Sequence, residues 1–332
     1  MKKLLFILLF LPVIGFSQDG PFYFTDNNIQ REFYLHIPNN LPQNSPIVYV
    51  FHGWFGSGSS IMTTTGFNTL SDQNNFAVCY PTGLNGEWDI EGLSDVDFIQ
   101  RLNDSLVNEH QFDANKVFAT GFSYGAELSY HLVNCQNTKV FAAIAPVGTS
   151  MWDYTTNGWA INCVPTNNIS VFILNGTNDN EFNYNGGYYP NVGSYFSVDS
   201  TVSYWADFNS CSISSNYTLT DFNNDNYLTE VTKYNNIITG DKVWLYKVNN
   251  GTHSWFNKTP GGTDDFWASE EIWNFFASVS NVQTGINEQN IKLSRKLIKT
   301  INVLGQSSKG KQNIPLFYIY DDGTVEKEII IE

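Results

Sequence analysis

The stretch VFATGFSYGAELSYHL, residues 117–132, contains the most informative pattern of this 332-residue chain, a G-x-S-x-G pentapeptide with Ser123 at its centre. An apolar, strand-like run (117–120) precedes it and a helix-like run (126–132) follows. Between a strand and a helix, this pattern is typical of a nucleophile elbow, in which a sharp turn holds the serine in a strained backbone conformation. The flanking glycines let neighbouring backbone approach without a Cβ clash. We therefore expect the Ser123 hydroxyl to project from the end of a parallel strand, above a helix N-terminus.

A serine of this kind needs a histidine base, and in α/β-hydrolases the order along the chain is serine, acid, histidine. Of the five histidines, only His131 and His253 follow Ser123. His131 lies in the helix-like run and precedes every suitable acid. His253 follows an alternating, strand-like run (243–248) on a short loop. We therefore predict that His253 is the base, against the alternative of a hydrogen-bonded loop histidine.

The acid is expected just after the next parallel strand beyond the elbow. Residues 169–174 are apolar and β-branched, and the loop that follows them reaches Asp179, the first choice. The alternative for Asp179 is a turn carboxylate bonded to its own backbone. Asp199 is expected to cap a helix over 201–208. The other carboxylates that remain open are Glu181, Asp199 and Asp207.

An oxyanion hole needs two backbone N–H groups aimed at the developing negative charge. One is expected from Tyr124, the residue after the nucleophile. The strand-like run 46–51 opens into a glycine-rich loop, from which the amide of Trp54 or Phe55 is expected as the second donor. His52 in this loop is predicted to be structural. The glycine spacing fits neither nucleotide-binding pattern, which argues against a phosphate cradle.

Several stretches of the chain resemble the secreted polyhydroxybutyrate-depolymerase-like esterases, which are similar to feruloyl and acetylxylan esterases of the α/β-hydrolase fold. The resemblance covers roughly residues 30 to 277. It implies a mostly parallel central sheet flanked by helices, no cofactor, and a triad of Ser123, Asp179 and His253. The matching stretches are His52-Gly53, Asp95-Val96-Asp97-Phe98, Gly121 to Gly125, Phe141 to Val147, Gly176-Thr177-Asn178-Asp179 and Gly251 to Trp255.

The chain departs from this family where Asn175 replaces a histidine, around Tyr124, and after Trp255. These positions border the acyl or alcohol pocket, so the departures concern specificity more than the reaction. Of the nine tryptophans, most are expected in the core. The pocket candidates are Trp54, Trp88 and Trp255.

The resemblance also implies a disulfide between Cys135 and Cys163, which would stabilise the fold by ~3 kcal/mol. Cys79 is expected to be a buried strand thiol, and the state of Cys211 stays open. No Cys/His spacing resembles a zinc site. Residues 221–226 begin like a calcium loop but lack its required glycine and its final glutamate, so an asparagine-rich turn is favoured.

Residues 1–18 have the features of a secretory signal peptide: two lysines, a short apolar run and a small-residue cleavage site. The apolar run is too short for a membrane span, so a secreted protein is expected. The formal net charge is −15. With no basic stripe in the sequence, this acidic balance argues against nucleic acid as a partner.

The body is predicted to be one α/β-hydrolase domain over 19–278, followed by a linker over 279–290. Inside the body we expect a capping box at Ser94–Asp97, at the start of a helix, and a final helix over 264–276. The tail, 291–332, reads as a small all-β unit with strands near 299–306 and 313–325. It resembles the C-terminal sorting domain of type IX secretion, which implies the secretion machinery as a partner. The alternative is a β appendage that binds substrate or the body.

These observations predict a secreted serine carboxylic-ester hydrolase that forms an acyl-enzyme and needs no cofactor or metal. Feruloyl or acetyl esters of plant polysaccharide are favoured as substrates, because of the aromatic-rich loops, and polyhydroxyalkanoate is the other polymer considered. Two alternatives stay open. One is a serine peptidase on the same fold, although the chain has no room for a large propeller domain. The other is a noncatalytic glycan-binding protein that retains the fold.

Overall fold

The computed structural model describes residues 19–135, 139–153, 163–189, 192–222, 226–257, 265–280, 297–302, 316–320 and 325–328. The chain divides into two compact units, residues 1–282 and 283–332, which are described separately. The predicted signal peptide lies outside the described residues, as do positions 281–290 of the predicted linker and the middle of the 221–226 turn.

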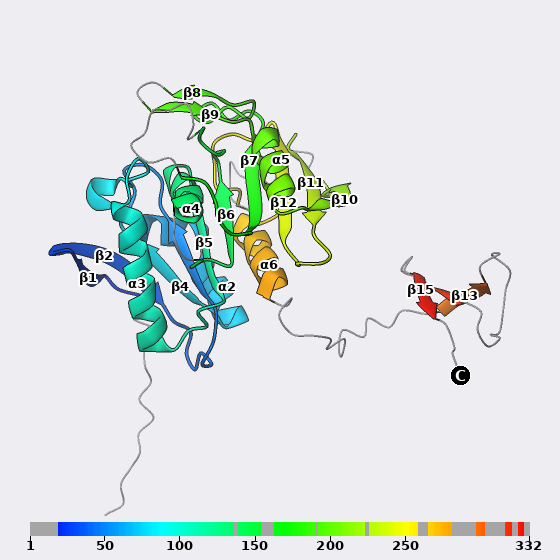
Figure 1. Ribbon diagram of the computed structural model, residues 1–332, viewed down its shortest axis with the longest axis horizontal. Helices are drawn as coiled ribbons and strands as arrows, with labels where there is room; N and C mark the ends of the chain where they lie inside the picture. The colour runs from blue at the N-terminus through cyan, green and yellow to red at the C-terminus, as the bar shows by residue number, and fades with distance from the viewer. Residues whose placement is uncertain are drawn as a thin grey trace, which may run out of the picture. The chain divides into compact units, whose positions relative to one another are not determined.

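The first unit is built on a ten-stranded sheet (Figure 1). Its six central strands, from β4 to β12, run parallel, and the two strands at each edge are antiparallel. The predicted mostly parallel sheet is confirmed, and the antiparallel edges were not anticipated. In spatial order the strands are β1 (Phe22–Asp26), β2 (Ile29–His36), β4 (Ala77–Pro81), β3 (Ile47–Phe51), β5 (Val117–Phe122), β6 (Ala143–Val147), β7 (Ser170–Gly176), β12 (Lys242–Asn249), β11 (Leu228–Asn235) and β10 (Ser212–Thr218).

Helices cover both faces of this sheet (Figure 1). Along β3, Tyr49 and Phe51 pack into one apolar cluster, whereas Val48 and Val50 pack into the other, as the two-residue period of a strand requires. Burial on both faces explains why the central strands are almost continuously apolar. One face carries α3 (Ser94–His110), α4 (Tyr124–Cys135) and α5 (Val198–Phe208), and the other carries α1 (Gly58–Thr65), α2 (Phe67–Asn74) and α6 (Ala268–Ser280).

Two predicted helix caps are wrong, and the final helix, α6, begins at Ala268 rather than at the predicted 264. The capping box expected at Ser94 is absent, because α3 already begins there and its N-cap residue, Leu93, offers no side-chain acceptor. The Ser94 hydroxyl instead donates to Asp89, 2.7 Å away. Asp199 does not cap α5, since that helix begins earlier than expected and Ser197 accepts the capping bond from a backbone amide. Serine is one of the preferred N-cap residues, so the local chemistry is ordinary.

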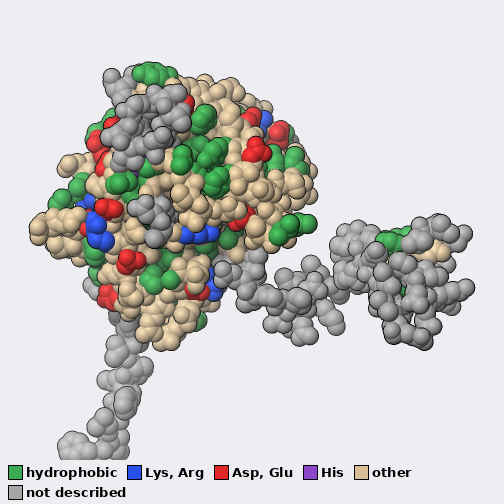
Figure 2. All heavy atoms as spheres, viewed as in Figure 1, with side chains coloured by type: hydrophobic (Ala, Val, Ile, Leu, Met, Phe, Trp, Pro, Cys, Tyr) green, Lys and Arg blue, Asp and Glu red, His purple; other side chains and the backbone are tan. Residues whose placement is uncertain are grey.

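The expectations for three of the four cysteines are confirmed, and the fourth, Cys211, had been left open. Cys135, the last residue of α4, forms a disulfide with Cys163. Cys79 is a buried free thiol in β4, and burial raises its pKa. Cys211 is a free, partly buried cysteine. Lys and Arg side chains form only small, separate spots on the face of the body shown in Figure 2.

The second unit contains a three-stranded antiparallel sheet of β13 (Leu297–Asn302), β14 (Leu316–Tyr320) and β15 (Val325–Glu328). The predicted small β tail is present, although parts of the expected strands, at 303–315 and 321–324, lie outside the described residues. Across the described parts of both units, no helix has the length and apolar content needed to span a membrane.

Candidate active site

Ser123 occupies a strained turn between β5 and α4. Its φ of 54° lies in the left-handed region that residues with a Cβ rarely adopt. A Cβ on Gly121 would overlap the carbonyl oxygen of Gly125, and one on Gly125 would overlap the carbonyl oxygen of Phe51. Both glycines of the pentapeptide are therefore needed for close backbone approach. The Ser123 amide donates to Val147, 2.9 Å away, which ties the turn to the neighbouring strand.

Asp179 and His253 lie in contact. The Nδ1 atom of His253 is 2.7 Å from Oδ2 of Asp179, whose side chain is buried. The other carboxylate oxygen accepts the backbone amides of Glu181 and Phe182, each at 2.8 Å. Three hydrogen bonds thus fix the carboxylate, and one of its oxygens fixes the plane of the imidazole.

The loops that carry this pair follow neighbouring parallel strands, β7 and β12, and are joined by a bond from the Asn178 amide to the Gly251 carbonyl, at 2.8 Å. The His253 ring packs on Phe122, with 4.8 Å between ring centroids. A Cβ on Gly148 would lie 3.4 Å from Cε1 of His253. Since Phe122 precedes Ser123, the imidazole stands beside the elbow.

The other carboxylates considered from the sequence have different surroundings. Glu181 is exposed, and its backbone amide is bonded to Asp179. Asp199 accepts a hydrogen bond from the Tyr184 hydroxyl at 2.7 Å, and Asp207 is exposed on α5. Of these four, Asp179 is the one that the structure brings to His253.

The loop after β3 passes directly over the elbow. A Cβ on Gly53 would lie 3.5 Å from Cβ of Ser123. Phe55 has a φ of 54°, an outlier for an aromatic residue and a further sign of local strain. The rings of Trp54 and Phe55 stack with 4.5 Å between centroids and are both largely exposed. Gly53 thus lies against the serine, and the strained Phe55 follows two residues later in the same loop.

His52 is buried below this loop. One ring nitrogen, Nδ1, lies 2.7 Å from the Gly53 carbonyl, and Nε2 accepts the Gly83 amide at 2.9 Å. Burial lowers the pKa of this imidazole, and the hydrogen bond to Gly53 opposes the decrease. Both nitrogens are therefore engaged with backbone, and the ring joins two loops rather than facing solvent.

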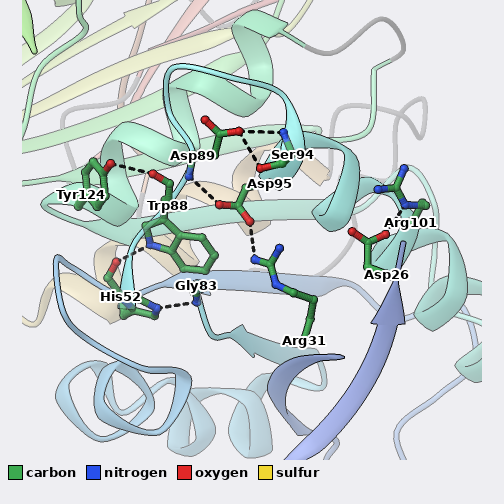
Figure 3. Close-up of polar contacts among 10 residues, drawn as sticks. All are labelled: Asp26, Arg31, His52, Gly83, Trp88, Asp89, Ser94, Asp95, Arg101 and Tyr124. Atoms are coloured by element: carbon green, nitrogen blue, oxygen red, sulfur yellow. Dashed lines mark hydrogen bonds and ion pairs between the residues drawn. The ribbon is translucent and has the colours of Figure 1, made fainter. Parts of the chain in front are cut away.

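Two predicted pocket residues lie elsewhere. Trp88 is buried, with its indole N–H bonded to the His52 carbonyl and its own carbonyl accepting the Tyr124 hydroxyl (Figure 3). Trp255 is buried on the opposite face of the sheet, where its indole N–H donates to Ser269. Neither lines the cavity described next, because each indole N–H finds its acceptor inside the core.

Ser123 lies on the wall of a cavity of about 230 Å³. Tyr124 lines the same cavity as several carboxylates. Burial raises the pKa of its hydroxyl, and the negative charges of Glu127, Glu87 and Glu91 raise that pKa further. Of the three tryptophans predicted to lie in the pocket, Trp54 lines this cavity, whereas Glu127, Trp152 and Tyr189 were not anticipated from the sequence. The cavity is lined by Trp54, Glu87, Ile90, Glu91, Ser123, Tyr124, Glu127, Trp152, Glu181, Phe182, Tyr189 and Val192.

Glu127 is the buried member of the lining carboxylates, with 2% of its surface exposed. Burial raises its pKa to about 8, and a side-chain hydrogen bond with Trp152 opposes the rise. At neutral pH this side chain is therefore mainly a carboxylic acid, with an O–H donor as well as acceptors. The three other lining carboxylates are exposed and form what we call the acidic rim: Glu87, Glu91 and Glu181.

A polar network around Asp89 and Asp95 fixes the segment that leads into α3 (Figure 3). Glu87 and Glu91 belong to this segment. Asp95 forms a buried ion pair with Arg31 and accepts the Asp89 amide at 2.7 Å. Asp89 in turn accepts the Gly92 amide at 2.7 Å and the Ser94 hydroxyl. Among the described residues, no group of three or more His, Cys, Asp or Glu side chains is arranged to hold a metal ion.

The chain is similar in sequence to known esterases. It is 31% identical over 165 residues to a bifunctional acetylxylan esterase/xylanase of Neocallimastix patriciarum, covering 49% of this chain and 23% of that protein. It is 30% identical over 156 residues to a probable acetylxylan esterase A of Aspergillus niger, covering 42% and 51%. A probable feruloyl esterase C of the same species is 29% identical over 167 residues, covering 47% and 58%. The chain is therefore homologous to acetylxylan and feruloyl esterases. It spans under two thirds of each relative, and no family model matches it.

Solved structures extend this likeness to the fold. An acetyl xylan esterase from Aspergillus awamori superposes with a TM-score of 0.53 and 19% identity, over 80% of this chain and all of the other. The fold is that of the α/β-hydrolases. A thermophilic esterase from Thermogutta terrifontis gives a TM-score of 0.52 with 12% identity, over 79% and 94%.

Proposed function

We propose that this protein is a serine carboxylic-ester hydrolase with Ser123 as nucleophile, His253 as general base and Asp179 as the group that orients the imidazole. The observation that carries the proposal is the 2.7 Å contact between Asp179 and His253 beside a serine with a φ of 54°. The homology to esterases supports the same reaction.

In the proposed first step, Ser123 Oγ attacks the ester carbonyl carbon while Nε2 of His253 takes the hydroxyl proton. The tetrahedral oxyanion is stabilised by the Tyr124 amide, in the first turn of α4, and by the Trp54 or Phe55 amide. The imidazolium then protonates the leaving alkoxide as the C–O bond breaks, leaving an acyl-serine. Water attacks this ester, giving its proton to His253, and the acid and the free serine are released. Asp179 stays ionised and stabilises the imidazolium throughout.

Acetyl or feruloyl esters of plant polysaccharide are the proposed substrates. This rests on the names of the homologous proteins, acetylxylan esterase and feruloyl esterase, and on the aromatic lining of the cavity. We propose further that the protein is secreted by means of its N-terminal signal and that the C-terminal β unit serves sorting by the type IX machinery. The predicted signal peptide and the sorting resemblance support these two points.

Hydrolysis of p-nitrophenyl acetate by the wild type, Ser123→Ala and His253→Ala tests the mechanism. Loss of about 10³-fold or more in kcat/KM in both variants, with unchanged circular dichroism, is expected. A fluorophosphonate should label the wild type and not Ser123→Ala. Activity that survives in Ser123→Ala would overturn the assignment of the nucleophile. Relative kcat/KM for acetylated xylan, methyl ferulate and a hydroxybutyrate oligomer then tests the substrate class, and the hydroxybutyrate ester as best substrate would contradict it.

A further inference from the structure

Glu127 lies one helical turn beyond Ser123 on α4. Residues four apart lie on the same side of a helix, and side chains lean toward its N-terminus, so the Glu127 carboxyl is directed toward the serine end of the cavity. Its backbone amide donates to the Ser123 carbonyl at 3.1 Å. Both residues line the same cavity. No step of the proposed mechanism uses this carboxyl.

The surroundings of Glu127 differ from those of the acidic rim. Its side chain is almost fully buried, and no Lys or Arg is among the described residues that line the cavity. Burying a carboxyl without a cation is costly, and buried polar groups ordinarily have hydrogen-bond partners. Trp152 lines the same cavity and is the side chain that interacts with this carboxyl. A carboxylic acid has a donor and several acceptor positions, so a single neighbour of this kind leaves most of its bonding capacity unused.

We infer that Glu127 is a specificity-determining residue, whose carboxyl binds a hydroxyl on the carbon next to the esterified carbon of a carbohydrate substrate. This inference rests on the proposed ester-hydrolase function. A hydroxyl next to the ester stays close to the reacting carbonyl, and Glu127 is only about 6 Å along the helix from Ser123. A phenolic hydroxyl at the far end of an aromatic acyl group would lie beyond this position. The uncharged acid suits a neutral hydroxyl, which can both donate and accept.

The test compares methyl 2-O-acetyl-β-xylopyranoside with its 3-deoxy analogue, which lacks the neighbouring hydroxyl. Acetate release is measured for the wild type, Glu127→Gln, Glu127→Leu and the control Glu109→Leu, an exposed carboxylate near the far end of α3. The wild type should prefer the hydroxylated ester about tenfold in kcat/KM, the value of one well-made hydrogen bond. Glu127→Leu should reduce the preference to about twofold or less. Glu127→Gln should keep part of it, and Glu109→Leu all of it.

An unchanged preference in Glu127→Leu would overturn the inference. A purely structural role would lower both rates together and leave their ratio intact. A second readout is the pH dependence of the ratio, which should change between pH 7 and 9 in the wild type as the carboxyl loses its proton, and stay flat in Glu127→Gln.

Hydrolysis of p-nitrophenyl acetate, which has no such hydroxyl, separates this inference from the proposed function. Ser123-dependent hydrolysis without a hydroxyl preference would refute the role of Glu127 alone. If no ester is hydrolysed, the proposed function fails. Calorimetric binding of methyl β-xylopyranoside and its 3-deoxy analogue then tests Glu127 without turnover. Equal affinities, or no binding of either sugar, would overturn the inference.

Discussion

The cavity beside Ser123 has two walls that are held in place differently. We call residues 87–91 the polar-anchored wall and residues 181–189 together with Val192 the aromatic wall. Beneath the polar-anchored wall lie the buried Arg31–Asp95 ion pair and the bonds that join Trp88 to His52 and Tyr124 (Figure 3). These anchors come from strand β2, from the loop after β3 and from helices α3 and α4. None of them involves Asp179 or His253.

The aromatic wall, by contrast, is fixed mainly by ring contacts. The Phe182 ring packs on Trp152, Tyr189 and Tyr195. The two tyrosines belong to the ribbon formed by β8 (Gly187–Tyr189) and β9 (Gly193–Tyr195). One of the polar anchors of this wall is Asp179, which accepts the Glu181 and Phe182 amides. The same carboxylate holds His253. The aromatic wall is therefore coupled to the proposed catalytic residues. The polar-anchored wall, in contrast, can be changed without altering any contact of Asp179 or His253.

Asp179 substitutions should produce the largest effect and expose this coupling. Asp179→Asn retains an oxygen for the two loop amides but presents the wrong group to Nδ1 of His253, so kcat/KM should fall by about 10³- to 10⁴-fold. Asp179→Ala should also raise KM, because the loop amides lose their acceptor. Steady-state kinetics on p-nitrophenyl acetate measures both.

Asp207→Asn provides the matched control, since it makes the same chemical change at an exposed position of α5. Its kcat/KM should stay within about twofold of the wild type. Asp179→Asn activity within tenfold of the wild type would remove Asp179 from the proposed machinery and leave it as a loop anchor.

Removing the ion pair under the polar-anchored wall should mainly affect stability. Asp95→Ala leaves the buried Arg31 guanidinium without its carboxylate, a change that costs about 3–5 kcal/mol in the free energy of unfolding. Asp97→Ala removes another first-turn carboxylate of α3, an exposed one 3.7 Å from Arg101, and should cost about 0.5 kcal/mol or less. Urea unfolding measures both. Equal losses in the two variants would show that the buried pair does not anchor this wall.

The part of the site that follows the strand order could be predicted from the sequence. Ser123, Asp179 and His253 each come directly after a strand of the parallel sheet, and carboxyl ends of parallel strands meet at one edge. Chain order and strand patterns made these three positions the first choices, while Glu181, Asp199 and Asp207 stayed open as acids. The parallel core of the sheet was also predictable, because continuous apolar runs mark strands that are buried on both faces.

The walls could not be predicted, because loop paths depend on contacts distant in the sequence. Trp88 and Trp255 were expected in the pocket only as aromatic residues near the motifs, but their indoles find acceptors in the core. Tyr189, in the three-residue strand β8, and Trp152, which forms a β-bridge with Tyr195, line the cavity from segments too short to show a periodic pattern. Glu127 is the exception: an acidic residue four positions after the elbow serine could have been recognised from helical spacing.

Glu127 lies on α4 and belongs to neither wall, so its protonation should affect stability without disturbing the anchors. Its folded pKa, about 8, exceeds the ordinary value of 4.5. The folded state thus holds the proton more tightly, and stability falls as pH rises from the lower value to the higher. Glu127→Gln should gain about 2–4 kcal/mol relative to the wild type between pH 5 and pH 9. Urea unfolding at both pH values measures this, and a pH-independent difference would contradict it.

The smallest expected effect concerns the acidic rim, the one property that both walls share. Glu91 on the polar-anchored wall and Glu181 on the aromatic wall are exposed and equally charged. They should repel an anionic ester, and because salt screens exposed charges, the repulsion should weaken as ionic strength rises. The ratio of kcat/KM for 4-acetoxybenzoate to that for its neutral methyl ester should rise about threefold between 10 and 500 mM NaCl.

Glu91→Gln and Glu181→Gln should each reduce this salt dependence. A reduction in only one variant would show that the alcohol portion of the ester approaches along that wall, and no salt dependence in the wild type would mean that the rim does not act on the substrate.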